Sequence, residues 1–257
     1  MPADRPAAPP DPTDRPPGPD PAPVPAAPGL PAAVLWDMDG TLVDSEPQWD
    51  VSLQETAREL GGTLGAAARG ALLGADIATS VRVLLDDIGR PATPELVART
   101  TETLLARTAA LFRRGVVWQP GAREALETVR ASGVPAALVT NSARRLTELV
   151  LDGIGREFFA VTVCGDEVPA GKPAPDPYLR AAALLDVPVT ACVAVEDSPN
   201  GALSAERAGA AVLVVHGSVP APAGARLVHR AGLVGLTMAE LAALAALGPG
   251  ATPTRVA

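Results

Sequence analysis

The feature that most constrains the fold is a regular alternation of short apolar runs and amphipathic segments from residue 120 onward. Each apolar run has the length of a buried β-strand, and a longer helical pattern separates it from the next. Strands that alternate with helices form parallel sheets covered by helices on both faces. We therefore predict a doubly wound α/β core with a mostly parallel sheet, with strands near 134–139, 160–164, 191–195 and 211–215, helices near 122–131, 143–152, 177–185 and 201–208, and a last amphipathic helix near 238–247.

The pattern between residues 48 and 114 is helical throughout. Apolar side chains recur at helical spacing, as at Leu53, Ala57 and Leu60, and no strand-like run interrupts them. This block follows a short apolar run at 32–36, which we interpret as the first strand. We therefore predict an all-helical cap domain over 48–114, inserted into an α/β core made of residues 32–47 and 115–248.

The two ends of the chain differ from the core in composition. Thirteen of the 28 prolines lie in residues 1–31, together with many alanines and aspartates. Such a segment has too few large apolar side chains to offset the entropy lost on ordering. We predict a disordered tail over 1–31 and a flexible tail over 249–257. A proline-rich ligand for a partner domain is the alternative for the first of these.

Composition argues against several classes of function. The net charge of -8 and the pI near 4.8 provide no basic field for nucleic acid. The chain shows no export signal and no apolar run of about 18 residues, so we expect a cytoplasmic protein without a membrane span. Cys164 and Cys192 form no CxxC pair and lie in apolar stretches, which predicts buried thiols. We expect a monomer or a weak oligomer.

Polar residues gather at the carboxyl ends of the predicted strands. The segments at 37–41, 140–142 and 196–198 follow strands directly, and 171–173 lies in the loop after the strand that ends near Cys164. Ligands of open α/β sheets bind outside the carboxyl ends of the strands. We therefore expect these four segments to form one site.

The four segments resemble the ordered motifs of the haloacid dehalogenase-like hydrolases. The stretches that carry the resemblance are DMDGTLVDSE from residue 37, VTNS from 139, GKPAPDPY from 171 and VEDSPNG from 195. Four motifs in order over residues 33–215 are far more specific than one alone. The helical insertion resembles the small cap of the phosphoglycolate phosphatase and β-phosphoglucomutase branch. The resemblance implies a Rossmann-like core and a Mg²⁺-dependent phosphatase for a small phosphorylated metabolite, such as a sugar or hydroxyacid phosphate.

The resemblance assigns a role to each residue of the first motif. Asp37 would be the nucleophile and would become an aspartyl phosphate. Asp39, two residues later on the same side of an extended segment, would protonate the leaving oxygen and then activate water. The Asp39 backbone carbonyl would bind Mg²⁺, Gly40 would permit a tight turn, and Thr41 would orient the Asp39 carboxylate.

The last motif would complete the metal site. Asp197 would join Asp37 in the oxygen shell of Mg²⁺, and Glu196 would bind directly or through water. A shared ion requires that Asp37 and Asp197 lie within about 10 Å of each other. Ser198 precedes Pro199 and a predicted helix, which is typical of an N-cap residue.

The two remaining motifs would bind the phosphoryl group. Thr140 and Asn141 would supply hydroxyl and backbone donors at the start of a helix, although Thr-Asn-Ser alone is also an ordinary cap. Lys172 is the only lysine of the chain. It falls where the family has a lysine, and a compact ammonium can contact both the nucleophile and the phosphoryl group.

Related activities of the family fit the sequence less well. A Schiff base would need a lysine in the insertion, which has none, and Asp39 with Asp197 argues against metal-free dehalogenation. A mutase of the β-phosphoglucomutase kind remains an alternative, although Asp76 would repel a second phosphate. A catalytically silent protein that binds phosphorylated metabolites is the alternative of another class.

Three arginines of the insertion are candidates for substrate contacts. They are Arg58, Arg69 and Arg82. Each also fits a solvated helix face, which is the more common place for an arginine.

Overall fold

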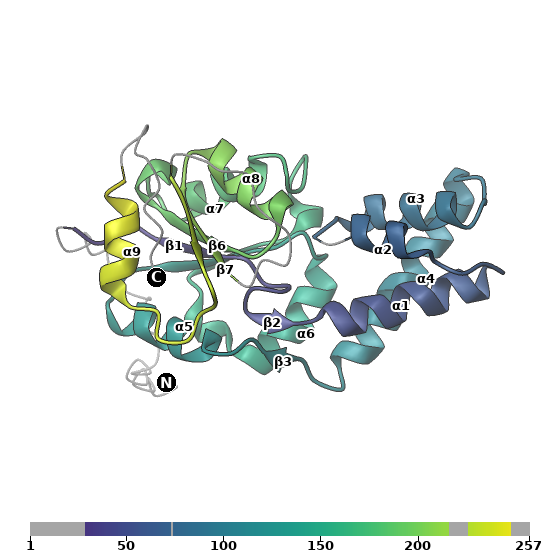
Figure 1. Ribbon diagram of the computed structural model, residues 1–257, viewed down its shortest axis with the longest axis horizontal. Coiled ribbons are helices and arrows are strands. Elements are labelled where there is room, and N and C mark those ends of the chain that lie inside the picture. Colours follow the sequence, from purple (N-terminus) through teal and green to yellow (C-terminus); the bar gives the residue numbers. More distant parts are fainter. Residues whose placement is uncertain (1–28, 73, 216–225, 248–257) are drawn as a thin grey trace, which may run out of the picture.

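The computed structural model describes residues 29–72, 74–215 and 226–247. The predicted tails therefore lie almost entirely outside the described residues. The described chain forms an α/β core from which a bundle of four helices extends to one side (Figure 1).

The core is built on a six-stranded sheet in which all neighbouring strands are parallel. Its strands, in spatial order, are β5 (Val161–Val163), β4 (Ala136–Val139), β1 (Val34–Trp36), β6 (Val193–Glu196), β7 (Ala211–Val215) and β8 (Leu227–Arg230). This arrangement is the doubly wound order of Rossmann-type sheets. The predicted fold class is confirmed.

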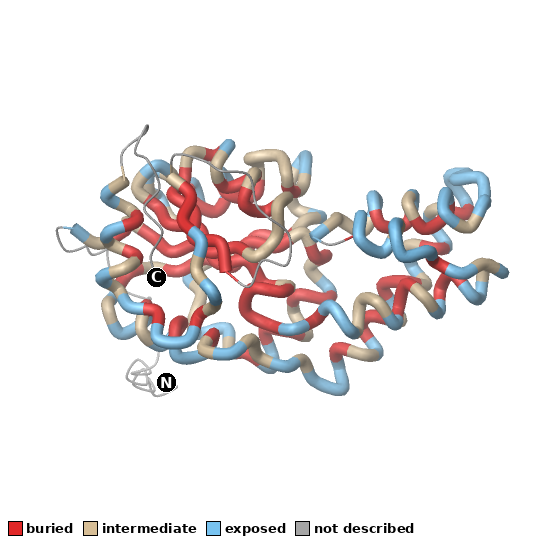
Figure 2. The backbone as a smooth tube through the Cα atoms, viewed as in Figure 1, coloured by how far each residue is buried: buried red, intermediate tan, exposed pale blue. Residues whose placement is uncertain are grey.

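Five helices cover the two faces of the sheet (Figure 1). Side chains alternate along β1, so that Val34 and Trp36 enter one apolar cluster and Leu35 enters the other. Helices α5 (Ala122–Ala131), α6 (Arg144–Ile154) and α9 (Met238–Ala245) contribute to the first cluster, and α7 (Asp176–Leu184) and α8 (Pro199–Ala208) to the second. The four inner strands, β4, β1, β6 and β7, are buried on both faces (Figure 2). Short 3₁₀ turns at Arg156–Phe158, Gly165–Glu167 and Val189–Ala191 complete the connections.

The block between β2 (Val43–Asp44) and β3 (Val117–Trp118) is helical. Its helices are α1 (Glu46–Glu59), α2 (Ala66–Ala71), α3 (Ile77–Asp87) and α4 (Pro94–Phe112). They enclose their own apolar cluster, which includes Leu53, Leu84 and Leu104. Helix α1 begins before the predicted boundary at residue 48, because Pro47 lies in its first turn, where a missing N–H costs nothing.

Three strands were not expected from the sequence. The insertion is joined to the core by a two-stranded antiparallel ribbon of β2 (Val43–Asp44) and β3 (Val117–Trp118). These strands are too short to show an apolar alternation. Strand β8 carries two buried residues followed by His229 and Arg230 at the edge of the sheet, so its apolar run is also short.

Several local predictions agree with the structure. Ser198 caps α8 by accepting a hydrogen bond from the Gly201 N–H at 3.0 Å, and Pro199 follows it. Both cysteines are free and buried, and burial raises the pKa of the Cys164 thiol to about 11. None of the helices in the described part of the chain is long and apolar enough to cross a bilayer.

Gly121 packs closely against the loop that follows β8. Its φ of +79° is left-handed, and an added Cβ would overlap the backbone of Val234. Gly133 has a similar φ of +76° but nothing within 4 Å of the added atom. Gly133→Ala should therefore cost only backbone strain, about 1 kcal/mol, whereas Gly121→Ala should cost about 3 kcal/mol or more. Urea unfolding of both variants measures the difference, and equal losses would contradict this packing.

Candidate active site

The candidate site lies where the strand order of the sheet reverses. The chain builds β1, β4 and β5 toward one edge and then adds β6, β7 and β8 on the other side of β1. Loops that leave β1 and β6 therefore diverge, and the crevice between them is the usual ligand site of such sheets. Asp37 directly follows β1, and Asp197 directly follows β6. The Asp37 N–H donates to the Val195 carbonyl at 3.0 Å, which joins the two strand ends.

Three carboxylates converge at this crevice. One oxygen atom each of Asp37, Glu196 and Asp197 lies within 4.8 Å of the others. Burial and the charge of Glu196 raise the pKa of Asp37 to about 7, against the opposing effect of Lys172. Burial and the charges of Asp37 and Glu196 also raise the pKa of Asp197 well above its ordinary value. The structure thus brings Asp37 and Asp197 together, as a shared cation requires.

Lys172 supplies the positive charge of this cluster. It is 4% exposed, and its Nζ donates to Asp37 Oδ1 at 2.6 Å, to Glu196 Oε1 at 2.6 Å and to the Val139 carbonyl at 2.7 Å. Burial lowers the pKa of Lys172, but the charges of Asp37 and Glu196 raise it above its ordinary value. The expected contact with Asp37 is present. All three ammonium protons are used within the protein.

The charges of the cluster do not balance. Three carboxylates face one ammonium, so two negative charges remain when all groups are ionised. A set of carboxylate oxygens in this state fits a hard divalent cation such as Mg²⁺. The side chain of Asp39 is not part of the group of carboxylates that could hold a metal among the described residues.

Glu196 has a second partner that the sequence did not single out. Tyr178, buried in α7, donates a hydrogen bond from its hydroxyl to Glu196 Oε1. Burial and the charge of Glu196 raise the pKa of Tyr178 well above its ordinary value, so the hydroxyl keeps its proton. Tyr178 is the only tyrosine of the chain and lies in the GKPAPDPY segment, a signal that could have drawn attention to it.

Asp39 is surrounded by hydrogen-bond donors. Its Oδ1 accepts from the Ser45 hydroxyl at 2.5 Å and from Trp49 Nε1 at 3.2 Å. Its Oδ2 accepts from the Ser142 hydroxyl at 2.7 Å and from the Thr140 hydroxyl at 3.2 Å. Thr140 therefore contacts Asp39 in this structure. Sequence reasoning missed Ser45 and Trp49 and treated Ser142 only as part of a cap, because no local pattern links them to Asp39.

The role expected for Thr41 is wrong. Its hydroxyl donates to Asp197 Oδ1 at 2.9 Å and makes no hydrogen bond to Asp39. The cause is the turn at Gly40, where a φ of +84° redirects the chain toward the end of β6. Gly40 is needed there for a second reason, because an added Cβ would overlap Oδ2 of Asp197. The chain turns at Gly40, where the sequence predicts a tight turn.

The side chain of Asn141 organises the rim of the site. Its Oδ1 accepts from the Lys172 N–H at 2.7 Å, and its Nδ2 donates to the carbonyls of Lys172 at 3.1 Å and Gly74 at 3.0 Å. Asn141 thus fixes the loop that carries Lys172 and joins it to the insertion. Among the described residues, none accepts a hydrogen bond from the backbone N–H of Asn141, which is the predicted phosphate donor.

A cavity of about 530 Å³ opens between the sheet edge and the insertion. Asp37, Asp39, Lys172 and Asp197 line one side of it. Helices α1 and α2 and the turn after α2 line the other side, with Asp50, Leu53, Arg69, Leu72 and Gly74 among their residues. The cavity therefore places any bound molecule between the acidic cluster and the insertion.

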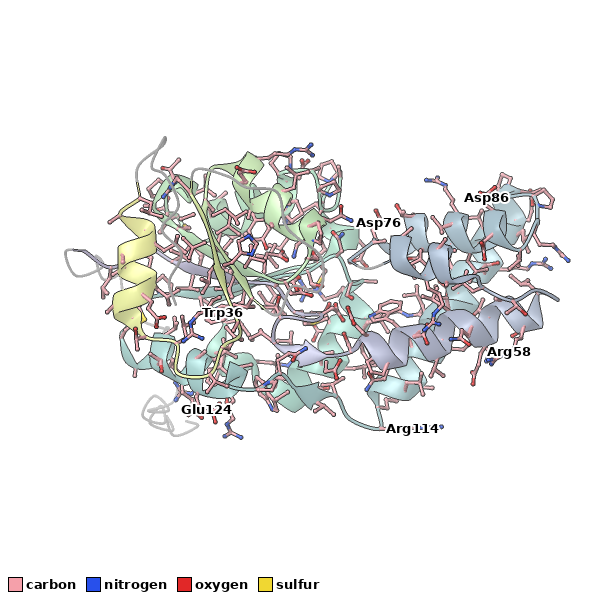
Figure 3. All side chains as sticks on the ribbon, viewed as in Figure 1. Trp36, Arg58, Asp76, Asp86, Arg114 and Glu124 are labelled. Carbon is pink, nitrogen blue, oxygen red and sulfur yellow. The ribbon has the colours of Figure 1, made fainter. Side chains whose placement is uncertain are left out.

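Only one of the three candidate arginines lines this cavity. Arg69 does so, and its Nε donates to Asp50 Oδ1 at 2.6 Å. Arg58 lies on the outer side of α1 and donates to Gln54 (Figure 3). Arg82 is exposed on α3. Asp76 faces the core (Figure 3) and caps α3 by accepting from the Thr79 N–H at 2.7 Å.

Comparison with known proteins gives consistent matches. A family model described as haloacid dehalogenase-like hydrolase matches residues 31–209. Hexitol phosphatase B of Escherichia coli K12 is 31% identical over 201 residues, which cover 74% of this chain and 84% of that protein. Phosphoglycolate phosphatase of Pseudomonas syringae pv. tomato is 32% identical over 190 residues, covering 72% and 70%.

The fold has a close counterpart among solved structures. The crystal structure of CbbY from Rhodobacter sphaeroides in complex with phosphate superposes with a TM-score of 0.72 at 27% identity, covering 80% of this chain and 96% of that one. The family match spans more than half of the chain and includes all four motif segments. The chain belongs to the haloacid dehalogenase-like hydrolases.

Proposed function

We propose that this protein is a Mg²⁺-dependent phosphatase that hydrolyses a small phosphorylated metabolite through an aspartyl phosphate. The observation that carries the proposal is the buried cluster of Asp37, Glu196, Asp197 and Lys172, with Asp39 lining the same cavity. Relatives whose names describe phosphatases support the reaction class.

The reaction has two halves. In the first, a carboxylate oxygen of Asp37 attacks phosphorus, the bond from phosphorus to the ester oxygen breaks, and Asp39 gives its proton to the leaving oxygen. In the second, Asp39 takes a proton from water, the water oxygen bonds to phosphorus, and the bond to Asp37 breaks. Hydroxyls of Ser45 and Ser142 hold the Asp39 carboxylate for both steps.

Asp37 and Asp197 would hold the metal ion, together with the Asp39 backbone carbonyl. The sequence offers Glu196 as a further candidate ligand of the ion. A bound Mg²⁺ would offset the negative charge that otherwise repels an anionic phosphate ester from a carboxylate nucleophile. Thr41 supports this site by donating to Asp197. Lys172 holds Asp37 in place, and the backbone N–H of Asn141 and the hydroxyl of Thr140 are the proposed phosphoryl donors.

The charges of the cavity favour a substrate without a second anionic group. Asp44 of β2 and Glu46 and Asp50 of α1 line the cavity opposite the sheet, and among the described residues on this side Arg69 is the only basic one. Arg69 already pairs with Asp50. Burial raises the pKa of Glu46, and the neighbouring charges of Asp44 and Asp39 raise it further. A sugar or polyol phosphate fits this side better than a hydroxyacid phosphate.

The same charges disfavour the mutase alternative. A mutase must hold a bisphosphorylated intermediate, and its distal phosphate would face these carboxylates. In the sequence this argument rested on Asp76, but Asp76 caps α3. In the structure, the carboxylates that line the cavity and support the argument are Asp44, Glu46 and Asp50. Release of glucose 6-phosphate from β-glucose 1-phosphate, without inorganic phosphate, would favour the mutase.

Substitution of the two aspartates separates their roles. With p-nitrophenyl phosphate and Mg²⁺, Asp37→Asn should lose turnover by roughly a thousandfold or more and form no phosphoenzyme. Asp39→Asn should still be phosphorylated, because p-nitrophenolate leaves without a proton, but should release phosphate slowly. Rapid-quench measurement of acid-stable phosphoprotein distinguishes the two. Wild-type-like turnover by either variant would contradict its assignment.

Mg²⁺ should stabilise the folded chain, because it binds only where the carboxylates converge. At a concentration about 100-fold above its Kd, it should raise the Tm by about 5–10 °C relative to EDTA. Asp197→Asn should remove most of this shift. Asp76→Asn is the matched control, since asparagine also caps helices and Asp76 lies outside the cluster. An unchanged shift in Asp197→Asn would exclude Asp197 as a ligand.

Paired substrates test the charge of the cavity. Sorbitol 6-phosphate and 6-phosphogluconate have the same carbon chain and differ at the end distal to phosphate, which is neutral in one and a carboxylate in the other. We expect kcat/KM to be roughly tenfold higher for sorbitol 6-phosphate, and the ratio to fall in Glu46→Gln and at high salt. Equal or faster hydrolysis of 6-phosphogluconate would contradict the argument.

A silent binding protein predicts the opposite outcome in the assays that follow turnover. It would be stabilised by phosphate esters and Mg²⁺ but would release no phosphate from any of them. Asp37 and Asp39 are both present, and both line the cavity, so no feature of the site favours this alternative.

A further inference from the structure

The position of Lys172 depends on Glu196. The ammonium has three protons, and its acceptors are Asp37, Glu196 and the Val139 carbonyl. All three acceptors lie at strand ends: Asp37 directly follows β1, Val139 ends β4 and Glu196 ends β6. Glu196 is, with Asp37, one of the two acceptors whose side chains carry a compensating negative charge. It therefore both aims and neutralises the lysine.

The carboxylate of Glu196 is itself held in one orientation. Its Oε1 accepts from Lys172 and from the Tyr178 hydroxyl. Its Oε2 lies 3.4 Å from the Ser198 hydroxyl, and the carboxylate packs against Gly201, where any Cβ would overlap it. Glu196 is fully buried, so no solvent competes for these contacts. Tyr178 thus supplies the hydroxyl that shares Oε1 of this carboxylate with Lys172.

The ring of Tyr178 also contacts the lysine. Lys172 Nζ lies 5.2 Å from the ring centroid, within the range of a cation–π contact. Tyr178 lies six positions after Lys172 along the chain, at the start of α7. Its hydroxyl and its ring therefore act on two members of the same buried group, and a substitution to phenylalanine separates the two contributions.

We propose that Tyr178 is a positioning residue for phosphoryl transfer, and that it holds Glu196 as the partner of Lys172 rather than as a metal ligand. This inference rests on the proposed phosphatase function. Two donors already occupy Oε1 of Glu196, which are as many as its lone pairs accept, and the Ser198 hydroxyl donates to Oε2 at 3.4 Å. The metal is then left to Asp37, Asp197 and the Asp39 carbonyl.

Tyr178→Phe removes the hydroxyl and keeps the ring. The buried Oε1 of Glu196 loses a donor, the Glu196–Lys172 pair loosens, and Lys172 no longer holds Asp37 in a single position. We expect kcat to fall by about tenfold, which corresponds to one lost charge-assisted hydrogen bond. We expect KM and the Kd for Mg²⁺, measured by calorimetry without substrate, to stay within about twofold of wild type.

Two further variants make the test specific. Glu196→Gln keeps the shape but removes the charge, and should also lower kcat while leaving the Kd for Mg²⁺ near wild type. Asp197→Asn should instead weaken Mg²⁺ binding. Thr108→Val removes another buried hydroxyl, which donates to the Leu104 carbonyl in α4, and controls for a general loss of stability. It should leave kcat unchanged even where it lowers the Tm.

Three outcomes would overturn the inference. A kcat of Tyr178→Phe within twofold of wild type would show that the hydroxyl does not act on the reaction. A Mg²⁺ affinity that falls as far in Glu196→Gln as in Asp197→Asn would make Glu196 a metal ligand. An equal loss of kcat in Thr108→Val would indicate a general effect. If Tyr178→Phe does not fold, the kcat of Glu196→Gln takes its place, and a value within twofold of wild type would overturn the inference. Failure of the wild-type chain to release phosphate at all would instead overturn the proposed function.

Discussion

The buried ammonium of Lys172 is the interaction on which the rest of the site depends. It lies between Asp37 and Glu196, and the three groups have almost no contact with solvent. Loss of the lysine would leave two carboxylates buried and unpaired, which costs about 3–5 kcal/mol in comparable buried pairs. The same charge keeps Asp37 ionisable although burial raises its pKa. Stability and chemistry therefore rest on one group, in a chain that has no other lysine.

The doubly wound sheet is what brings these groups together. Strands β1 and β6 are neighbours in space but are separated in the chain by the insertion and by β4 and β5. Their carboxyl ends carry Asp37 and Asp197, and the loop with Lys172 reaches the same edge. Asn141 then ties that loop to Gly74 of the insertion. The acidic cluster and the insertion that faces it are thus held by a short chain of hydrogen bonds across the cavity.

Much of this could be predicted from the sequence, because the relevant signals are local. Apolar periodicity located five of the six strands of the sheet and the helical insertion, and the strand ends identified Asp37, Lys172 and Asp197 as neighbours. The missed elements, β2, β3 and β8, are short and carry little periodicity. The partners of Asp39 were missed for another reason. Ser142 is 103 positions away along the chain, and Trp49 belongs to the insertion.

The sequence by itself determined the types and order of the chemical groups, because each motif follows its strand along the covalent chain. Only the tertiary structure decided which donor serves which carboxylate. Thr41 is two positions from Asp39, yet it binds Asp197, which is 156 positions away. Tyr178 in α7 similarly binds Glu196 at the end of β6. A left-handed turn at Gly40 and the packing of α7 on the sheet set these directions, and neither pairing can be deduced from spacing along the chain.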